Sequence, residues 1–91
     1  MAGRVEVYIH SDKAVQNKGA CLIELSCETD FCARTEQFID FSKKAAKMIY
    51  AFGSWDNAVE SMPELGEELK SLSESLGEEI SIKQACVVNV E

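Results

Sequence analysis

Residues whose types could do chemistry are concentrated between Cys27 and Arg34, where the sequence reads Cys-Glu-Thr-Asp-Phe-Cys-Ala-Arg. Acids, an aromatic ring and a guanidinium meet there, where a strand-like run ends and a helical run approaches. In one interpretation Thr29 or Asp30 caps a helical turn and Phe31 fills the core beneath it, and composition alone favours this. In the other, Phe31 is exposed beside Asp30, which is typical of a protein-interface anchor. The residues themselves leave both interpretations open.

The sequence offers little for catalysis. Its one histidine, His10, has no acid or nucleophile near it in the sequence. Glu28 and Asp30 lie two positions apart in a turn and do not converge as an acid–base pair must. The phosphate-loop pattern G-x-x-x-x-G-K-[ST] is absent. We therefore expect no catalytic residue, no cofactor and no enzyme activity.

The cysteines are Cys21, Cys27, Cys32 and Cys86. None forms a C-x-x-C pair, the tight spacing that zinc sites usually show. Cys21 and Cys27 share one face of a strand-like run and are too far apart to bond. We expect reduced core thiols and no metal. Two alternatives remain: a metal site completed by Cys86 and His10, and a metal- or redox-responsive cluster of Cys27, Cys32 and Cys86.

Two strands lead into the Cys27–Arg34 segment. Residues 4–10 alternate, with Val5, Val7 and Ile9 on one side and polar or aromatic residues on the other, which indicates a half-buried strand. Residues 20–27 form a second strand-like run. The short connection between the two runs favours an antiparallel hairpin.

Two amphipathic helices follow the segment. Apolar residues at three- and four-residue steps predict a helix over residues 35–52 that ends at Gly53. Ser61 and Glu64 have capping-box spacing and predict the start of a second helix, which Gly77 ends.

Residues 80–90 are rich in Ile and Val and predict a third strand. Val87 points to the opposite face from Cys86 and Val88, yet it is apolar too. This suggests that the second half of the strand has both faces covered. The order strand, strand, helix, helix, strand predicts a single α+β domain over residues 1–91. We expect a small three-stranded antiparallel sheet with two helices packed on one face.

Composition limits the classes of partner. The 91 residues allow one domain, and 9 Lys and Arg against 16 Asp and Glu give a net charge of −7. No basic cluster exceeds Lys43, Lys44 and Lys47, which argues against nucleic acid as the main partner. No apolar run approaches the roughly 20 residues that span a bilayer. The start of the chain lacks the features of a secretory signal. We therefore expect a cytoplasmic protein without a membrane partner.

The segment belongs to a longer recognisable pattern. Residues 27–31 (Cys-Glu-Thr-Asp-Phe), followed by residues 33–38 (Ala-Arg-Thr-Glu-x-Phe), resemble the signature of translation elongation factor Ts. Residues 8–10 and 19–26 are similar to the two strands that lead into that signature. Residues 76–83 resemble the family's Gly-Glu-Asn-Ile-x-Val-x-Arg segment. The resemblance covers nearly the whole chain.

The resemblance implies the fold of one subdomain of the family's core, or dimerisation, domain. It also implies a guanine-nucleotide exchange factor that binds elongation factor Tu and promotes GDP release during translation elongation. In the family an Asp-Phe pair enters the GTPase near the nucleotide, and the matching positions are Asp30 and Phe31, with Thr29 as their neighbour. The candidates for a supporting role are Cys27, Glu28, Arg34 and His10.

The sequence also departs from the family pattern. The N-terminal helical domain is missing, one core subdomain stands where many members have two, and Ser26 and Cys32 replace the usual Asn and Val. The alternative function is therefore a non-exchanging adaptor for elongation factor Tu, as a subunit of an assembly or a competitor of a host factor. Because family members with one core subdomain can dimerise through it, a homodimer is also expected.

Overall fold

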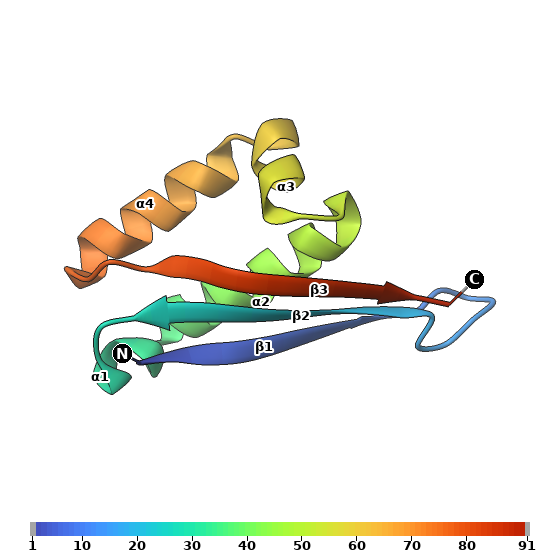
Figure 1. Cartoon of the computed structure of the whole chain (residues 1–91), viewed down its shortest axis with the longest axis horizontal. Coiled ribbons are helices and arrows are strands. Elements are labelled where there is room, and N and C mark those ends of the chain that lie inside the picture. The colour runs from blue at the N-terminus through green and yellow to red at the C-terminus, as the bar shows by residue number, and fades with distance from the viewer. Residues whose placement is uncertain (1, 91) are drawn as a thin grey trace.

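A central strand organises the fold. The computed structural model describes residues 2–90. Strand β2 pairs antiparallel with both β1 and β3 in the order β1-β2-β3. Four helices lie between β2 and β3 in the sequence, so the predicted α+β arrangement is confirmed (Figure 1). In chain order, the elements are β1 (Ala2–His10), β2 (Gly19–Cys27), α1 (Asp30–Ala33), α2 (Glu36–Phe52), α3 (Trp55–Ser61), α4 (Glu64–Leu76) and β3 (Ser81–Asn89).

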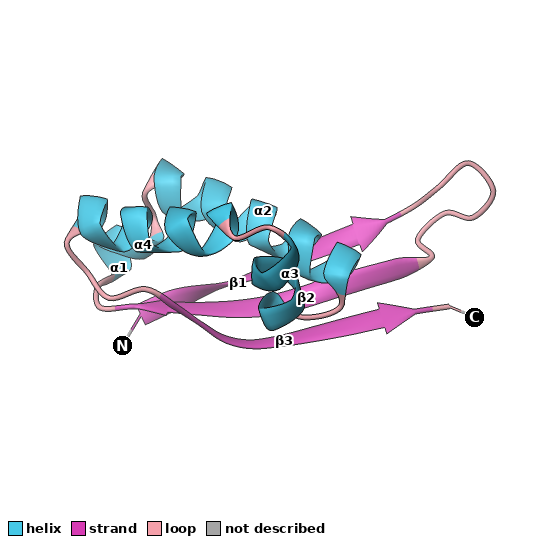
Figure 2. Ribbon diagram, turned by 90° about the horizontal axis from the view of Figure 1, so that it is seen from above, coloured by secondary structure: helices cyan, strands magenta, loops and turns pink. Residues whose placement is uncertain are grey.

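The helices form a single layer on one side of the sheet (Figure 2). Helix α2 packs on β1 and β2, and α3 and α4 continue the layer beyond it. Each large side chain that is fully buried in this contact stabilises the fold by about 1.5–3 kcal/mol. The buried residues of β2 and α2 that form the main core are Cys21, Ile23, Leu25, Cys27, Phe38, Phe41, Ala45, Ala46 and Ile49.

Local signals set most helix ends. The Thr35 side chain accepts a hydrogen bond from the backbone N–H of Phe38, and Gly53 and Gly77 end their helices with positive φ angles of 92° and 69°. The predicted capping box is wrong, because Ser61 is the last residue of α3 and is already helical. Helix α4 begins after Pro63 without a side-chain cap, and a proline there has no N–H that needs a partner.

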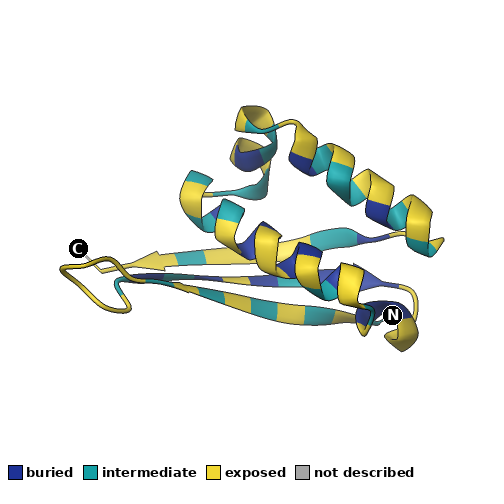
Figure 3. Ribbon diagram, turned by 180° about the vertical axis from the view of Figure 1, so that it is seen from behind, coloured by how far each residue is buried: buried dark blue, intermediate teal, exposed yellow. Residues whose placement is uncertain are grey.

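Strand β1 alternates as predicted between half-buried and exposed residues (Figure 3). The exposed residues include the apolar ones, so the apolar side of the strand faces away from the helices. The side toward α2 carries long polar and aromatic residues that find partners there. The Glu6 carboxylate accepts a hydrogen bond from Ser42 at 3.3 Å, and the ring of Tyr8 packs against that of Tyr50. We call the uncovered side of the sheet the outer sheet face. Its large exposed apolar residues are Val5, Val7, Ile9, Leu22 and Val88.

The expectation that the second half of β3 is covered on both faces is wrong. Cys86 and Val88 are exposed on the outer sheet face, and Val87 is only half-buried toward the helices. The cause is the position of α2, which lies over β1 and β2 and contacts β3 only slightly. Cys86 is therefore not a core thiol.

No helix formed by residues 2–90 has the length and apolar character needed to cross a membrane.

Candidate functional site

The Thr29-Asp30-Phe31 segment forms a tip at one end of the sheet (Figure 1). Strand β2 ends at Cys27, which pairs with Ala2 of β1, and α1 begins three residues later. The Thr29 hydroxyl accepts a hydrogen bond from the backbone N–H of Cys32 at 3.1 Å and so caps α1. The predicted capping role of Thr29 is confirmed.

Phe31 does not fill the core. Its exposed fraction is 78%, the largest among the exposed large hydrophobic residues in the described part of the chain. Asp30 beside it is also exposed. The core-filling interpretation of Phe31 is therefore wrong, and the tip presents an apolar ring next to a carboxylate to solvent.

Glu78 connects the tip to the turn after α4. Its Oε1 accepts hydrogen bonds from the backbone N–H groups of Glu28 and Thr29 at 2.9 and 3.0 Å, and its Oε2 accepts one from the Thr29 hydroxyl at 2.5 Å. In return, Glu28 Oε2 accepts a hydrogen bond from the backbone N–H of Glu79 at 2.7 Å. We call this reciprocal set of hydrogen bonds the tip brace. It holds Thr29 from two sides, because the same residue also caps α1.

Sequence reasoning missed the role of Glu78. Gly77 indicated a helix end, but no local pattern shows which distant segment the following acid reaches. The available signal was indirect, since residues 27–31 and 76–83 both resemble segments of one family and could have been expected to meet.

The tip brace makes stability depend on pH. The Thr29 hydroxyl is the main reason that the pKa of Glu78 lies below its ordinary value of 4.5, and the N–H groups of Glu28 and Thr29 lower it further. A carboxyl with a lowered pKa in the folded state contributes stability above its unfolded pKa and loses it as pH falls through its folded pKa. Below pH 4.5 we therefore expect the melting temperature of the wild type to fall more steeply with pH than that of Glu78→Gln.

Glu79→Gln is the matched control for this measurement. It removes the same charge one position further on, from an exposed side chain outside the tip brace. Its melting temperature should follow the pH dependence of the wild type. Identical pH profiles for Glu78→Gln and Glu79→Gln would contradict the contribution of the tip brace.

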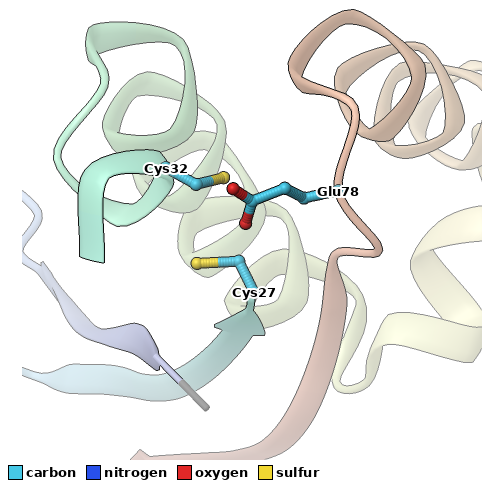
Figure 4. Close-up of side chains that lie close together, drawn as sticks. All are labelled: Cys27, Cys32 and Glu78. Atoms are coloured by element: carbon cyan, nitrogen blue, oxygen red, sulfur yellow. The ribbon is translucent and has the colours of Figure 1, made fainter. Parts of the chain in front are cut away.

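Two buried thiols lie directly beneath the tip. Cys27 Sγ donates a hydrogen bond to the carbonyl of Thr29 at 3.3 Å, and Cys32 lies in α1. Burial, with Cys27 and Glu78 nearby, raises the pKa of the Cys32 thiol to about 12. The Cys32 side chain points toward the Glu78 carboxylate, and the Cys27 sulfur lies close to both (Figure 4). The expectation of reduced core thiols is confirmed for Cys27 and Cys32, and also for Cys21.

Two of the supporting candidates lie at the tip. Glu28 takes part in the tip brace, and the Arg34 side chain donates from Nε to the carbonyl of Asp30 at 3.3 Å. His10 does not belong to this site, because it lies at the opposite end of β1, eight residues or roughly 27 Å from Ala2. There its ring packs against Tyr50 with centroids 4.9 Å apart.

Both cysteine alternatives that included Cys86 are wrong. Cys86 pairs with Leu22 in the middle of β2, on the outer sheet face, whereas His10 faces the helices. Cys86 is also separated from Cys27, because Cys27 lies at the end of β2 and on the buried face of the sheet.

The fold and the tip define a small α+β domain that presents an exposed aromatic side chain on a braced strand-to-helix junction. No model of a known protein family matches the chain. Elongation factor Ts of Nitrosomonas eutropha is 39% identical over 83 residues, which cover 85% of this chain and 28% of that relative. Elongation factor Ts of Nautilia profundicola is 36% identical over 87 residues, covering 90% and 27%. That of Photorhabdus laumondii is 36% identical over 93 residues, covering 99% and 32%.

The chain is therefore homologous, over most of its own length, to one part of elongation factor Ts. It spans about 30% of the length of these relatives.

Proposed function

We propose that this chain binds elongation factor Tu in the cytoplasm and promotes the release of GDP during translation elongation. Homology to elongation factor Ts supports the choice of partner. The observation that carries the proposal is the 78% exposure of Phe31, beside the exposed Asp30, on the tip. Thr29, Asp30 and Phe31 would form the contact that enters the GTPase near its nucleotide.

The proposed mechanism needs no catalytic side chain. An exchange factor must bind the nucleotide-free GTPase more tightly than the GDP-bound form, and by linkage GDP then binds the complex more weakly by the same factor. The ring of Phe31 offers apolar area for insertion, and the carboxylate of Asp30 adds a negative charge next to it. A negative charge that enters near the bound magnesium and phosphates would disturb their contacts in the GDP-bound form.

Bracing of the tip favours such a role. Thr29 donates two hydrogen bonds to Glu78, one from its backbone N–H and one from its hydroxyl. The same hydroxyl accepts one from the backbone N–H of Cys32 and so caps α1. A contact that is already ordered in the free protein loses little conformational entropy on binding. The apolar contact made by the tip can therefore contribute to tighter binding of the nucleotide-free GTPase than of the GDP-bound form.

The second candidate function is an adaptor that binds elongation factor Tu without releasing GDP. The observation that favours it is the extent of the match, since the chain spans about 30% of the length of its relatives. Binding and exchange must therefore be measured separately.

Stopped-flow release of a fluorescent GDP analogue from bacterial elongation factor Tu separates the two functions. Under the exchange proposal, adding this chain accelerates release in proportion to its concentration until the GTPase is saturated. Capture of elongation factor Tu on the immobilised chain, measured in parallel, reports binding alone. Capture without acceleration would replace the exchange proposal with the adaptor. If the chain neither captures elongation factor Tu nor accelerates GDP release, both proposals are contradicted.

We also propose that the outer sheet face binds a second copy of this chain. Val7, Leu22 and Cys86 lie side by side across its middle, one on each strand. These three side chains are uncharged, and an apolar patch of this kind can pair with itself about a two-fold axis. Glu24, two positions from Leu22 on the same face, accepts a hydrogen bond from Gln84 at 2.8 Å. The acidic helix α4 lies in the helical layer on the other side of the sheet. Two copies can therefore meet there without bringing those charges together, despite a net charge of −7 each.

A further inference from the structure

Beneath the tip, three groups of metal-ligating type converge. The sulfurs of Cys27 and Cys32 and a carboxylate oxygen of Glu78 all lie within 4.8 Å of one another (Figure 4). They come from the end of β2, from α1 and from the turn after α4. Three separate segments of the chain therefore deliver one potential ligand each to the same point.

The spacing suits a tetrahedral zinc-like ion. Zinc bonds to thiolate sulfur at about 2.3 Å and to carboxylate oxygen at about 2.0–2.2 Å, so neighbouring ligand atoms lie roughly 3.5–3.8 Å apart. The three atoms here lie no more than 4.8 Å apart, so side-chain rotations would have to bring them somewhat closer. Two soft thiolates favour zinc and similar cations over magnesium and calcium, which prefer oxygen ligands alone.

The surroundings already orient the ligands. The carboxylate of Glu78 is fixed by the N–H groups of Glu28 and Thr29 and by the Thr29 hydroxyl. Hydrogen bonds of this kind hold a ligating carboxylate in place and tune its strength as a donor. Cys27 and Cys32 are buried, whereas Glu78 is half-buried, so solvent reaches the cluster from the side of Glu78.

We propose that Cys27, Cys32 and Glu78 bind one zinc-like divalent cation, with water as the fourth ligand. Binding replaces the two S–H bonds by two bonds from sulfur to the metal and releases both protons to solvent. Two thiolates and a carboxylate around a divalent cation leave one net negative charge. The bound cation joins β2, α1 and the turn after α4 directly beneath Phe31. The site stands independently of the exchange proposal, because its test measures metal binding alone.

Titration of the fully reduced chain with Co²⁺ under anaerobic conditions tests the site. The expected result is a thiolate-to-cobalt charge-transfer band and the visible absorption of tetrahedral Co²⁺, saturating at one cobalt per chain. Adding Zn²⁺ should remove both absorptions. A folded, reduced chain without these bands would overturn the proposal, and so would saturation at one cobalt per two chains.

Variants assign the ligands. Cys27→Ser and Cys32→Val should lose the charge-transfer band, and Glu78→Gln should weaken Co²⁺ binding by about 10-fold or more. Glu79→Gln is the matched control, because it removes the same charge one position after Glu78 from an exposed side chain and should leave the titration unchanged.

Circular dichroism without metal shows which variants are folded. Glu78→Gln alters a partly exposed side chain, so it decides the outcome if the buried-cysteine variants do not fold. A full band in folded Cys32→Val, unchanged affinity in Glu78→Gln, or loss of the band in Glu79→Gln would each refute the assignment.

Discussion

Replacing Phe31 by alanine is expected to lower the affinity for elongation factor Tu by about 30-fold, and with it the acceleration of GDP release. Truncating an aromatic residue at the centre of an interface typically costs about 2 kcal/mol or more of binding free energy. The fold should be unaffected, because the Phe31 side chain is 78% exposed. We expect the free energy of unfolding to change by less than about 0.5 kcal/mol. Stopped-flow GDP release and chemical denaturation measure the two quantities.

Two other alanine variants complete this comparison. Phe38 is fully buried in the main core, so Phe38→Ala should lower the free energy of unfolding by about 3–5 kcal/mol. Val15→Ala alters an exposed apolar residue in the loop at the far end of the sheet and should change neither binding nor stability. Full exchange activity in Phe31→Ala would place the contact elsewhere, and unfolding of Phe31→Ala would restore a core role for this ring.

Replacing Val7 by lysine is expected to weaken self-association by about 100-fold. The change removes apolar area from the middle of the proposed contact and places an unpaired charge there, which together cost about 3 kcal/mol. The monomer should tolerate lysine, because Val7 already faces solvent on the outer sheet face. Sedimentation equilibrium over a range of protein concentrations gives the dissociation constant of each variant.

Val15→Lys is the control for this experiment. It makes the same substitution at another exposed valine, in the loop between β1 and β2 and away from the outer sheet face. A wild-type chain that remains monomeric at all concentrations would contradict the proposed partner. Equal self-association of Val7→Lys and the wild type would move the contact to a different surface.

Features that depend on near neighbours could be predicted from the sequence. The period of the apolar residues in α2 and α4, and the glycines at positions 53 and 77, define these helices and their ends without tertiary contacts. The hairpin of β1 and β2 follows from two strand-like runs and a short polar loop. The sequence also isolated the segment that forms the tip, because acids, an aromatic ring and a guanidinium meet there between a strand-like run and a helical run.

Features that depend on how the helix layer packs on the sheet could not be predicted from the sequence. Hydrophobicity alone would turn Val7 of β1 inward, yet the helix layer instead covers the side where Glu6 and Tyr8 reach Ser42 and Tyr50. Partners from distant segments decide which side is buried, and periodicity carries no information on them. The tip brace and the convergence of its carboxylate with two thiols are hidden for the same reason.

The pairing of β1 with β2 also determines how the domain can be tethered. Ala2 pairs with Cys27 beside the tip, whereas Asn89 pairs with Gly19 at the other end of the sheet (Figure 1). A bead, dye or fusion partner joined ahead of residue 2 therefore crowds Phe31. The same group joined behind residue 90 stands the length of a nine-residue strand away. Carboxyl-terminal immobilisation thus displays the tip outward, and amino-terminal immobilisation obstructs it.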